Sequence, residues 1–144
     1  MPPDAFYPVE LVLEVRFRDL DPLRHVNNSV FLTYLEAARE AYWNRLGERL
    51  DLDGYGYILV RVECDFRAPI LYQGLGKTWV RVRIRAPRLG TKSWDFEYRL
   101  EDRDEGTLYA TARSVQVYAN IPANRSEPLP AEIRAKIERL EGRG

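Results

Sequence analysis

Two aspartates and the start of a helix lie close together in one short stretch, and their chemistry suits hydrolysis. Asp19 and Asp21 lie in a segment that has no hydrophobic period and contains a proline, which predicts a loop. A helical pattern begins at about Asn28, so both carboxylates directly precede a helix N-terminus. The free N–H groups there can bind a carbonyl oxygen as it becomes an oxyanion, and a nearby carboxylate can activate water or attack directly. These groups suffice for acyl transfer from a good leaving group such as a thiolate.

The same residue types also have ordinary structural interpretations. A loop aspartate before a helix often caps the loop or pairs with an arginine, and Asp19 has Arg16 and Arg18 nearby. His25 is the only histidine and Cys64 the only cysteine, which argues against a zinc site built from several such ligands. Cys64 lies in an apolar run and is predicted to be a buried core thiol. We therefore predict no metal and no cofactor.

The elements that must position this stretch follow from hydrophobic periodicity. Residues 9–18 alternate between apolar and charged side chains, with the apolar ones from Val9 to Phe17 on one face, which predicts a half-buried strand. Residues 28–46 have apolar residues at helical spacing, with Asn27 or Asn28 as the N-cap and a glycine as the stop. The apolar stripe expected to be buried is Phe31, Tyr34, Leu35, Ala38, Tyr42 and Leu46.

Four more strands and a short helix are predicted after this helix. The strands are expected at 57–67, 77–86, 93–101 and 107–119, with glycine-containing turns between them, and the helix at about 130–140. One long helix against one antiparallel sheet is an α+β arrangement. The inward residues expected for the first of these strands are Ile58, Val60, Val62, Cys64 and Phe66.

The outward face of the strand at 77–86 is rich in arginine. Arg81, Arg83 and Arg85 would lie beside Asp95 and Glu97 of the next strand in a hairpin. Cross-strand ion pairs explain both faces. A nucleic-acid stripe is disfavoured, because no outward aromatic residues interleave these arginines to stack on bases.

Length and composition set the class of protein. The chain has 144 residues, and we predict a single domain over residues 1–144. Acidic and basic residues number 22 each, so no net field favours nucleic acid or an anionic membrane. The N-terminus lacks a signal-peptide pattern and no apolar stretch is long enough to span a membrane, so a cytoplasmic protein is expected. A curled sheet leaves one edge exposed, which predicts self-association as a dimer or tetramer.

Residues 19–39 also resemble the signature of a known family. They read D-x-D-x-x-x-H-V-N-N-x-x-F-x-x-Y-x-E-x-A-R, which is similar to hot-dog-fold acyl-CoA thioesterases of the 4-hydroxybenzoyl-CoA thioesterase type. The stretch also resembles the catalytic segment of acyl-ACP thioesterases. The likeness extends over roughly residues 9–122. It implies a hot-dog fold, in which a five-stranded antiparallel sheet wraps a long central helix, and an acyl-CoA thioesterase activity.

The resemblance assigns roles to individual residues. Asp21 takes the position of the catalytic carboxylate, as general base or nucleophile, and the backbone N–H of Asn28 polarises the thioester carbonyl. His25 takes a position implicated in catalysis, and Asn27 is expected to contact the substrate. Glu36 either supports the site through a hydrogen bond or forms an ion pair three residues along the helix.

The resemblance also implies which carrier holds the acyl group and which residues bind coenzyme A. Leu23 stands where the acyl-ACP branch has asparagine, which favours coenzyme A over acyl carrier protein. Arg24 stands where many relatives have glycine, so it is expected to reshape the entrance, contact phosphate or mark a different substrate. Coenzyme A, as part of the substrate, is expected to have its phosphates held by Arg88, Lys92 and Arg125 near turns and strand ends.

Three aromatic residues are candidates for a substrate tunnel, and two other functions remain as alternatives. In the family the tunnel lies between subunits, and Tyr34, Trp79 and Trp94 are candidates to line it, although core packing explains them equally well. A hot-dog hydratase or dehydratase would use a histidine with an acidic partner. A non-catalytic acyl-CoA-binding protein or scaffold would keep the binding residues without hydrolysis.

Overall fold

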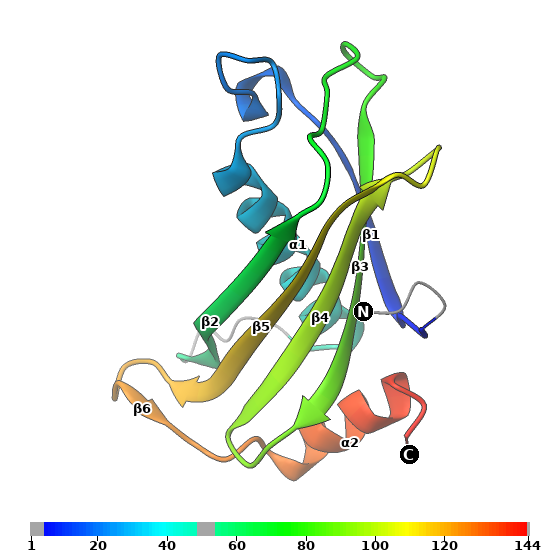
Figure 1. The fold of residues 1–144 in the computed structure, drawn as a ribbon. Coiled ribbons are helices and arrows are strands. Elements are labelled where there is room, and N and C mark those ends of the chain that lie inside the picture. The colour runs from blue at the N-terminus through cyan, green and yellow to red at the C-terminus, as the bar shows by residue number, and fades with distance from the viewer. Residues whose placement is uncertain (1–4, 49–53, 144) are drawn as a thin grey trace.

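The computed structural model describes residues 5–48 and 54–143, and in it a curled antiparallel sheet packs against one long helix (Figure 1). The main strands are β1 (Val9–Glu14), β2 (Tyr55–Phe66), β3 (Trp79–Leu89), β4 (Ser93–Asp102) and β5 (Leu108–Asn120), in the spatial order β1-β3-β4-β5-β2. The other elements are η1 (Phe17–Asp19), α1 (Asn28–Arg45), α2 (Ala131–Leu140) and the two-residue strand β6 (Arg125–Ser126), which pairs with β5. The predicted long helix, five main strands and C-terminal helix are confirmed.

β3 and β4 form the centre of the inner sheet face. Their inward side chains alternate with charged outward ones, as predicted, and each inward side chain is at most 1% exposed. This apolar surface is what holds α1 against the sheet. The residues are Val80, Val82, Ile84 and Ala86 on β3, and Trp94, Phe96, Tyr98 and Leu100 on β4.

α1 begins and ends where the sequence predicts. The side chain of Asn27 caps it by accepting a hydrogen bond from the backbone N–H of Ser29 at 2.9 Å. The helix stops before Gly47, whose φ of 80° suits glycine. The predicted apolar stripe is buried, while Leu32, beside it, is 38% exposed. The exposed side of α1 therefore borders the open edge of the sheet.

The prediction for the inward face of β2 is wrong in its first half. A bulge lies between Leu59, which pairs with Gln116, and Arg61, which pairs with Val115. The extra residue, Val60, reverses the alternation, so Tyr57 and Leu59 face inward before the bulge and Val62, Cys64 and Phe66 after it. As an edge strand β2 is also poorly covered, and Ile58, Val60 and Phe66 are 38%, 56% and 46% exposed.

The first strand is shorter than predicted. β1 ends at Glu14, and the chain then turns through η1, because Val15 leaves the strand ladder to donate to Thr78 O at 2.9 Å. Phe17, expected on the buried face, is 73% exposed. η1 and the loop before α1 lie at one end of the sheet, whereas the β3–β4 turn and α2 lie at the other end (Figure 1).

The arginines of β3 form ion pairs, although not all with the predicted partners. Arg85 contacts Glu97 at 2.7 Å, as expected for facing residues of a hairpin. Arg81 and Arg83 contact Glu101 instead, at 3.4 and 3.6 Å. Asp95 pairs with Arg88 and Arg113. A register shift between Arg85 and Arg88 brings Arg88 next to Asp95.

Within the described residues, no helix has the length and apolarity needed to cross a membrane.

Candidate active site

Asp21 closes a tight turn immediately before α1. Its Oδ1 accepts hydrogen bonds from the backbone N–H groups of Leu23 at 2.9 Å and His25 at 3.3 Å. Its backbone N–H donates to His25 O at 2.8 Å, and its carbonyl accepts from Arg24 N at 2.9 Å. Among the described residues no hydrogen bond reaches Oδ2. The carboxylate is therefore held rigidly through one oxygen and has the other available for chemistry.

The start of α1 supplies backbone donors next to this turn. Asn28 is the first helical residue, so its N–H has no acceptor within the helix. Asn27 precedes it and uses its side-chain oxygen for both the N–H and the hydroxyl of Ser29, each at 2.9 Å. The cap therefore engages Ser29 and leaves Asn28 N–H, with the partial positive charge of the helix end, for a ligand.

Asp19 caps the loop, one of the roles predicted for it, and also has a partner that the sequence did not indicate. Its Oδ2 accepts from the backbone N–H of Arg16 at 2.9 Å and from the hydroxyl of Tyr34 at 2.8 Å. Its carbonyl accepts from Asn27 N at 2.9 Å. Burial and this hydrogen bond to a carboxylate raise the pKa of Tyr34, so the phenol stays protonated. Asp19 thus joins η1, α1 and the helix cap.

His25 is held in the loop by its backbone. Besides its bonds with Asp21, it forms a β-bridge with Leu71, and Val26 N donates to Ile70 O at 3.0 Å. These hydrogen bonds attach the loop before α1 to the segment that follows β2. The imidazole is half-buried, and no hydrogen bond to it occurs among the described residues. The structure therefore brings His25 to Asp21 chiefly through main-chain atoms.

Arg24 lies at the tip of the turn with a φ of 63°. This left-handed conformation is easily adopted by glycine and costs other residues on the order of 1 kcal/mol. Glycine, which the family resemblance implies for this position, would adopt this conformation without that cost. The side chain of Arg24 is exposed at the loop surface, beside Leu23.

The other basic residues expected to bind coenzyme A lie far from Asp21 within one chain. Arg88 ends β3, Lys92 lies in the β3–β4 turn and Arg125 starts β6, at the end of the sheet opposite the loop before α1 (Figure 1). β3 alone has 11 residues, which separates its two ends by roughly 35 Å. Arg88 also pairs with Asp95, and Arg125 with Glu127. One protomer does not bring these groups to the Asp21 loop.

The three aromatic candidates for a substrate tunnel lie in three different environments. Tyr34 reaches the site through Asp19. Trp79 donates its indole N–H to Gly76 O at 3.0 Å and stacks under the guanidinium of Arg103. Trp94 is fully buried, with its ring 5.9 Å from that of Trp43, so core packing accounts for it.

Glu36 and Arg39 do not form the ion pair that their spacing allows. Glu36 is exposed, whereas Arg39 is 5% exposed and donates to the hydroxyl of Tyr98 at 3.2 Å. Sequence reasoning missed this contact. Polar residues at inward positions of β5, Ser114 and Gln116, were the signal available, because inward positions of a packed sheet are normally apolar.

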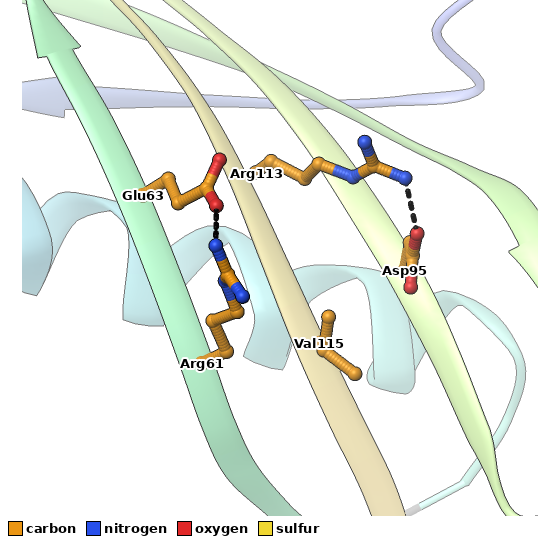
Figure 2. Close-up of a pocket in the computed structure, with 5 residues that line it drawn as sticks. All are labelled: Arg61, Glu63, Asp95, Arg113 and Val115. Atoms are coloured by element: carbon orange, nitrogen blue, oxygen red, sulfur yellow. Dashed lines mark hydrogen bonds and ion pairs between the residues drawn. The ribbon is translucent and has the colours of Figure 1, made fainter.

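A hollow of about 290 Å³ lies on the sheet face directed away from α1 (Figure 2). Arg61 contacts Glu63 on one side of it, and Arg113 contacts Asp95 on the other. Burial alone would raise the pKa of Asp95, but hydrogen bonds from Arg88 and Arg113 lower it. The charges here are paired with one another, which makes this hollow a structural ion-pair network.

The side-chain types that commonly bind metal ions are dispersed in the described part of the chain. Residues 5–48 and 54–143 contain no group of three or more His, Cys, Asp or Glu side chains arranged to hold an ion. Cys64 is a half-buried free thiol, less buried than predicted because β2 is an edge strand. Burial and the neighbouring Asp65 carboxylate raise its thiol pKa, which disfavours a thiolate nucleophile.

The fold and the comparisons with known proteins together define a class of protein. A long helix wrapped by an antiparallel sheet is the arrangement of the hot-dog fold. Residues 15–137 match the family model of the Thioesterase-like superfamily, and the chain belongs to this family. It is a thioester hydrolase with a hot-dog fold.

Individual relatives agree with this assignment. The long-chain acyl-CoA thioesterase FadM of Escherichia coli (strain K12) is 24% identical over 133 residues, which cover 89% of this chain and 96% of FadM. A thioesterase from Thermus thermophilus, solved with coenzyme A and Zn, is 38% identical with a TM-score of 0.83, covering 96% of this chain and 97% of that one. Slr0204, a 1,4-dihydroxy-2-naphthoyl-CoA thioesterase from Synechocystis, is 20% identical with a TM-score of 0.78, covers 89% and 93%, and shares the fold.

Proposed function

We propose that the protein hydrolyses acyl-CoA thioesters to free acids and coenzyme A, with Asp21 as the catalytic carboxylate. The observation that carries this proposal is the Asp21 turn, which fixes one carboxylate oxygen on two backbone N–H groups directly before α1. The names of two relatives support the substrate class, since FadM acts on long-chain acyl-CoA and the Thermus thioesterase was solved with coenzyme A.

The chemistry assigned to each group follows from its position. The thioester carbonyl accepts a hydrogen bond from Asn28 N–H, and the helix end stabilises the negative charge that develops on that oxygen. Asp21 Oδ2 then acts in one of two ways. As a general base it takes a proton from water, which attacks the carbonyl carbon. As a nucleophile it attacks that carbon itself, forming a mixed anhydride that water cleaves. In both cases the carbon–sulfur bond breaks and the thiolate leaves.

Three neighbours have supporting roles in this proposal. Asn27 fixes the helix start, and its exposed amide contacts the substrate. His25 holds Asp21 through its backbone, and its ring is the group available to protonate the leaving thiolate. Glu36, on the exposed side of α1, supports the acyl part of the site.

Self-association completes the binding site in this proposal. β2 is an open edge with exposed apolar side chains, Phe17 and Leu23 on either side of Asp21 are each 73% exposed, and Leu75 between β2 and β3 is 87% exposed. A second copy paired with β2 about a two-fold axis would run antiparallel to the first. The far end of its sheet, with Arg88, Lys92 and Arg125, would then approach the first copy's Asp21 loop and its Arg24. These residues could hold the phosphates of coenzyme A.

Replacement of Asp21 by asparagine tests the proposal. Asp21→Asn keeps an oxygen for the two backbone hydrogen bonds but removes the base or nucleophile, so kcat should fall at least about a hundredfold. Thiol release should be followed with acyl-CoA and acyl-ACP substrates of several chain lengths. Asp104→Asn, at an exposed aspartate in the β4–β5 turn, is the matched control and should retain full activity. Retention of most activity by Asp21→Asn would refute the assignment, and no turnover of any thioester by the wild type would refute the function.

A further inference from the structure

Arg39 is a buried cation without an acidic partner. It is 5% exposed, and among the described residues no carboxylate lies within ion-pair distance of its guanidinium. Its Nη1 donates to the hydroxyl of Tyr98 at 3.2 Å. A buried guanidinium that is neutralised by no carboxylate is costly, and a neutral hydroxyl satisfies only one of its five N–H donors.

A chain of buried polar groups holds this guanidinium from the core side. Tyr98 contacts Ser114, Ser114 donates to Gln116, and Gln116 donates to the backbone carbonyl of Trp94. Because the hydroxyl hydrogen of Ser114 is used on Gln116, Tyr98 must donate to Ser114 and accept from Arg39. Burial raises the pKa of Tyr98, so its hydroxyl keeps the hydrogen this requires. The chain therefore fixes Arg39 with its other donors free.

Arg39 lines two hollows, of about 170 and 420 Å³, that share it together with Glu36 and Leu59. These hollows lie between α1 and the inner side of β2. Their other apolar wall residues include Leu32 and Val62. Glu36 is exposed where the hollows meet solvent. The hollows therefore combine an apolar wall with fixed hydrogen-bond donors at Arg39.

The groove they form runs along the helix that starts at the Asp21 loop. Its first residue on α1 is Leu32, about one turn past Asn28. Arg39 is 11 residues past Asn28, which is about 16 Å along the helix axis. An acyl group whose carbonyl rests on Asn28 N–H can thus lie in the groove with its far end at Arg39.

We propose that this groove binds the acyl group and that Arg39 selects acyl groups with an oxygen acceptor at the end far from the thioester. This inference rests on the proposed function and names its substrate class. A plain alkyl end leaves the fixed donors of Arg39 unpaired, and sites built around polar groups discriminate strongly against ligands that lack the matching atom. Glu36 and Glu40 also line the groove, and their negative charges favour a neutral hydroxyl on the ligand over a further carboxylate.

Selectivity within one chain length tests the proposal. Hydrolysis of decanoyl-CoA, ω-hydroxydecanoyl-CoA and sebacoyl-CoA should be compared for the wild type and Arg39→Met. We expect kcat/KM for the hydroxylated chain to exceed that for decanoyl-CoA roughly tenfold or more in the wild type, with sebacoyl-CoA between them. Arg39→Met should remove this preference while still hydrolysing decanoyl-CoA.

Controls separate selectivity from folding and from the proposed function. Arg45→Met makes the same change at an exposed position of the same helix and should keep the wild-type ratio. Tyr98→Phe removes the hydroxyl that holds Arg39 and should lower the ratio without abolishing decanoyl-CoA turnover. A wild type that hydrolyses all three substrates equally would overturn the inference and leave the thioesterase proposal standing. If Glu36→Gln alone abolished the preference, Glu36 would be the selecting group and the role of Arg39 would be refuted.

Discussion

At the scale of single residues, the two aspartates of the loop have separate environments. Asp21 is held by backbone N–H groups of its own turn and has one oxygen without a partner among the described residues. Asp19 uses a single oxygen for both Arg16 N–H and the buried Tyr34 hydroxyl, and its carbonyl holds the helix cap. Asp19 is therefore placed to position the helix start against Asp21, and we expect it to act through that geometry.

Loss of the Tyr34–Asp19 hydrogen bond should slow the chemical step. Tyr34→Phe removes the hydroxyl with little change of shape, and Asp19→Asn removes the charge it contacts. Each should lower kcat roughly tenfold and leave KM nearly unchanged, since a hydrogen bond to a charged group contributes about 1.5–3 kcal/mol. The double variant should be no slower than the slower single one, because one change removes the hydrogen bond and the other removes the charge that strengthens the same bond. If Asp19→Asn is as inactive as Asp21→Asn while Tyr34→Phe is active, Asp19 is itself the essential acid.

At the scale of elements, α2 closes the end of the sheet that is remote from the catalytic loop. Ile137 is fully buried and Ile133 is 7% exposed, so the helix covers apolar core. Glu141, just after α2, accepts hydrogen bonds from Tyr42 on α1 and from Ala86 N at the end of β3, both through Oε2. One carboxylate thus ties α2 to the helix and to the sheet.

The contact at Glu141 should make stability depend on pH. Burial raises its pKa, and the hydrogen bonds from Tyr42 and Ala86 only partly oppose this. The folded state therefore favours the protonated form, so the contribution of Glu141 is fully present below the unfolded carboxyl value of about 4.3 and falls as pH rises through the folded value. Glu141→Gln keeps an oxygen for both bonds and does not titrate.

The measurement is urea unfolding of wild type and Glu141→Gln at pH 7 and at about pH 5. The wild type should gain stability relative to the variant as the pH falls, because only the wild type loses a buried charge. Other carboxylates titrate in both proteins and cancel in the difference. An identical difference at both pH values would show that Glu141 does not titrate in this range.

At the scale of the whole molecule, the residues proposed for catalysis and those proposed for coenzyme A binding do not meet within one chain. The loop of Asp21 and the basic residues Arg88, Lys92 and Arg125 lie at opposite ends of the sheet (Figure 1). Exposed apolar side chains follow the edge strand β2 and surround the loop. Both facts agree with a second copy supplying part of each site.

Complementation tests this shared site. Asp21→Asn lacks the proposed catalytic carboxylate, and a double variant Arg88→Ala/Lys92→Ala should bind coenzyme A weakly. In a two-fold dimer with shared sites, a mixed dimer has one site with all wild-type groups. An equal mixture, after subunit exchange, should recover about a quarter of the wild-type activity, since about half of the dimers are mixed and each has one intact site. Activity that merely averages those of the separate variants would exclude sharing of these residues.

The features of this protein that the sequence predicts are those set by residues close together in the chain. The strand and helix positions and the inward faces of β3 and β4 were predicted because they arise from neighbouring residues and regular alternation, and Asn27 was one of the two predicted caps. The placement of Asp21 directly before a helix start was equally local. The motif of residues 19–39 indicated the family, and the family match over residues 15–137 confirms it.

Only the tertiary structure decided the features that depend on residues distant in the chain. The bulge at Val60 exists in the pairing of β2 with β5, and alternation along β2 alone predicted the wrong face for the residues before it. The bond from Arg39 to Tyr98 spans 59 residues, and helical spacing suggested Glu36 as the partner instead. The loop of Asp19 and Asp21 shows both contributions. The order of its residues placed Asp21 beside the start of α1, but the contact of Tyr34 with Asp19 fixed how the loop lies against that helix.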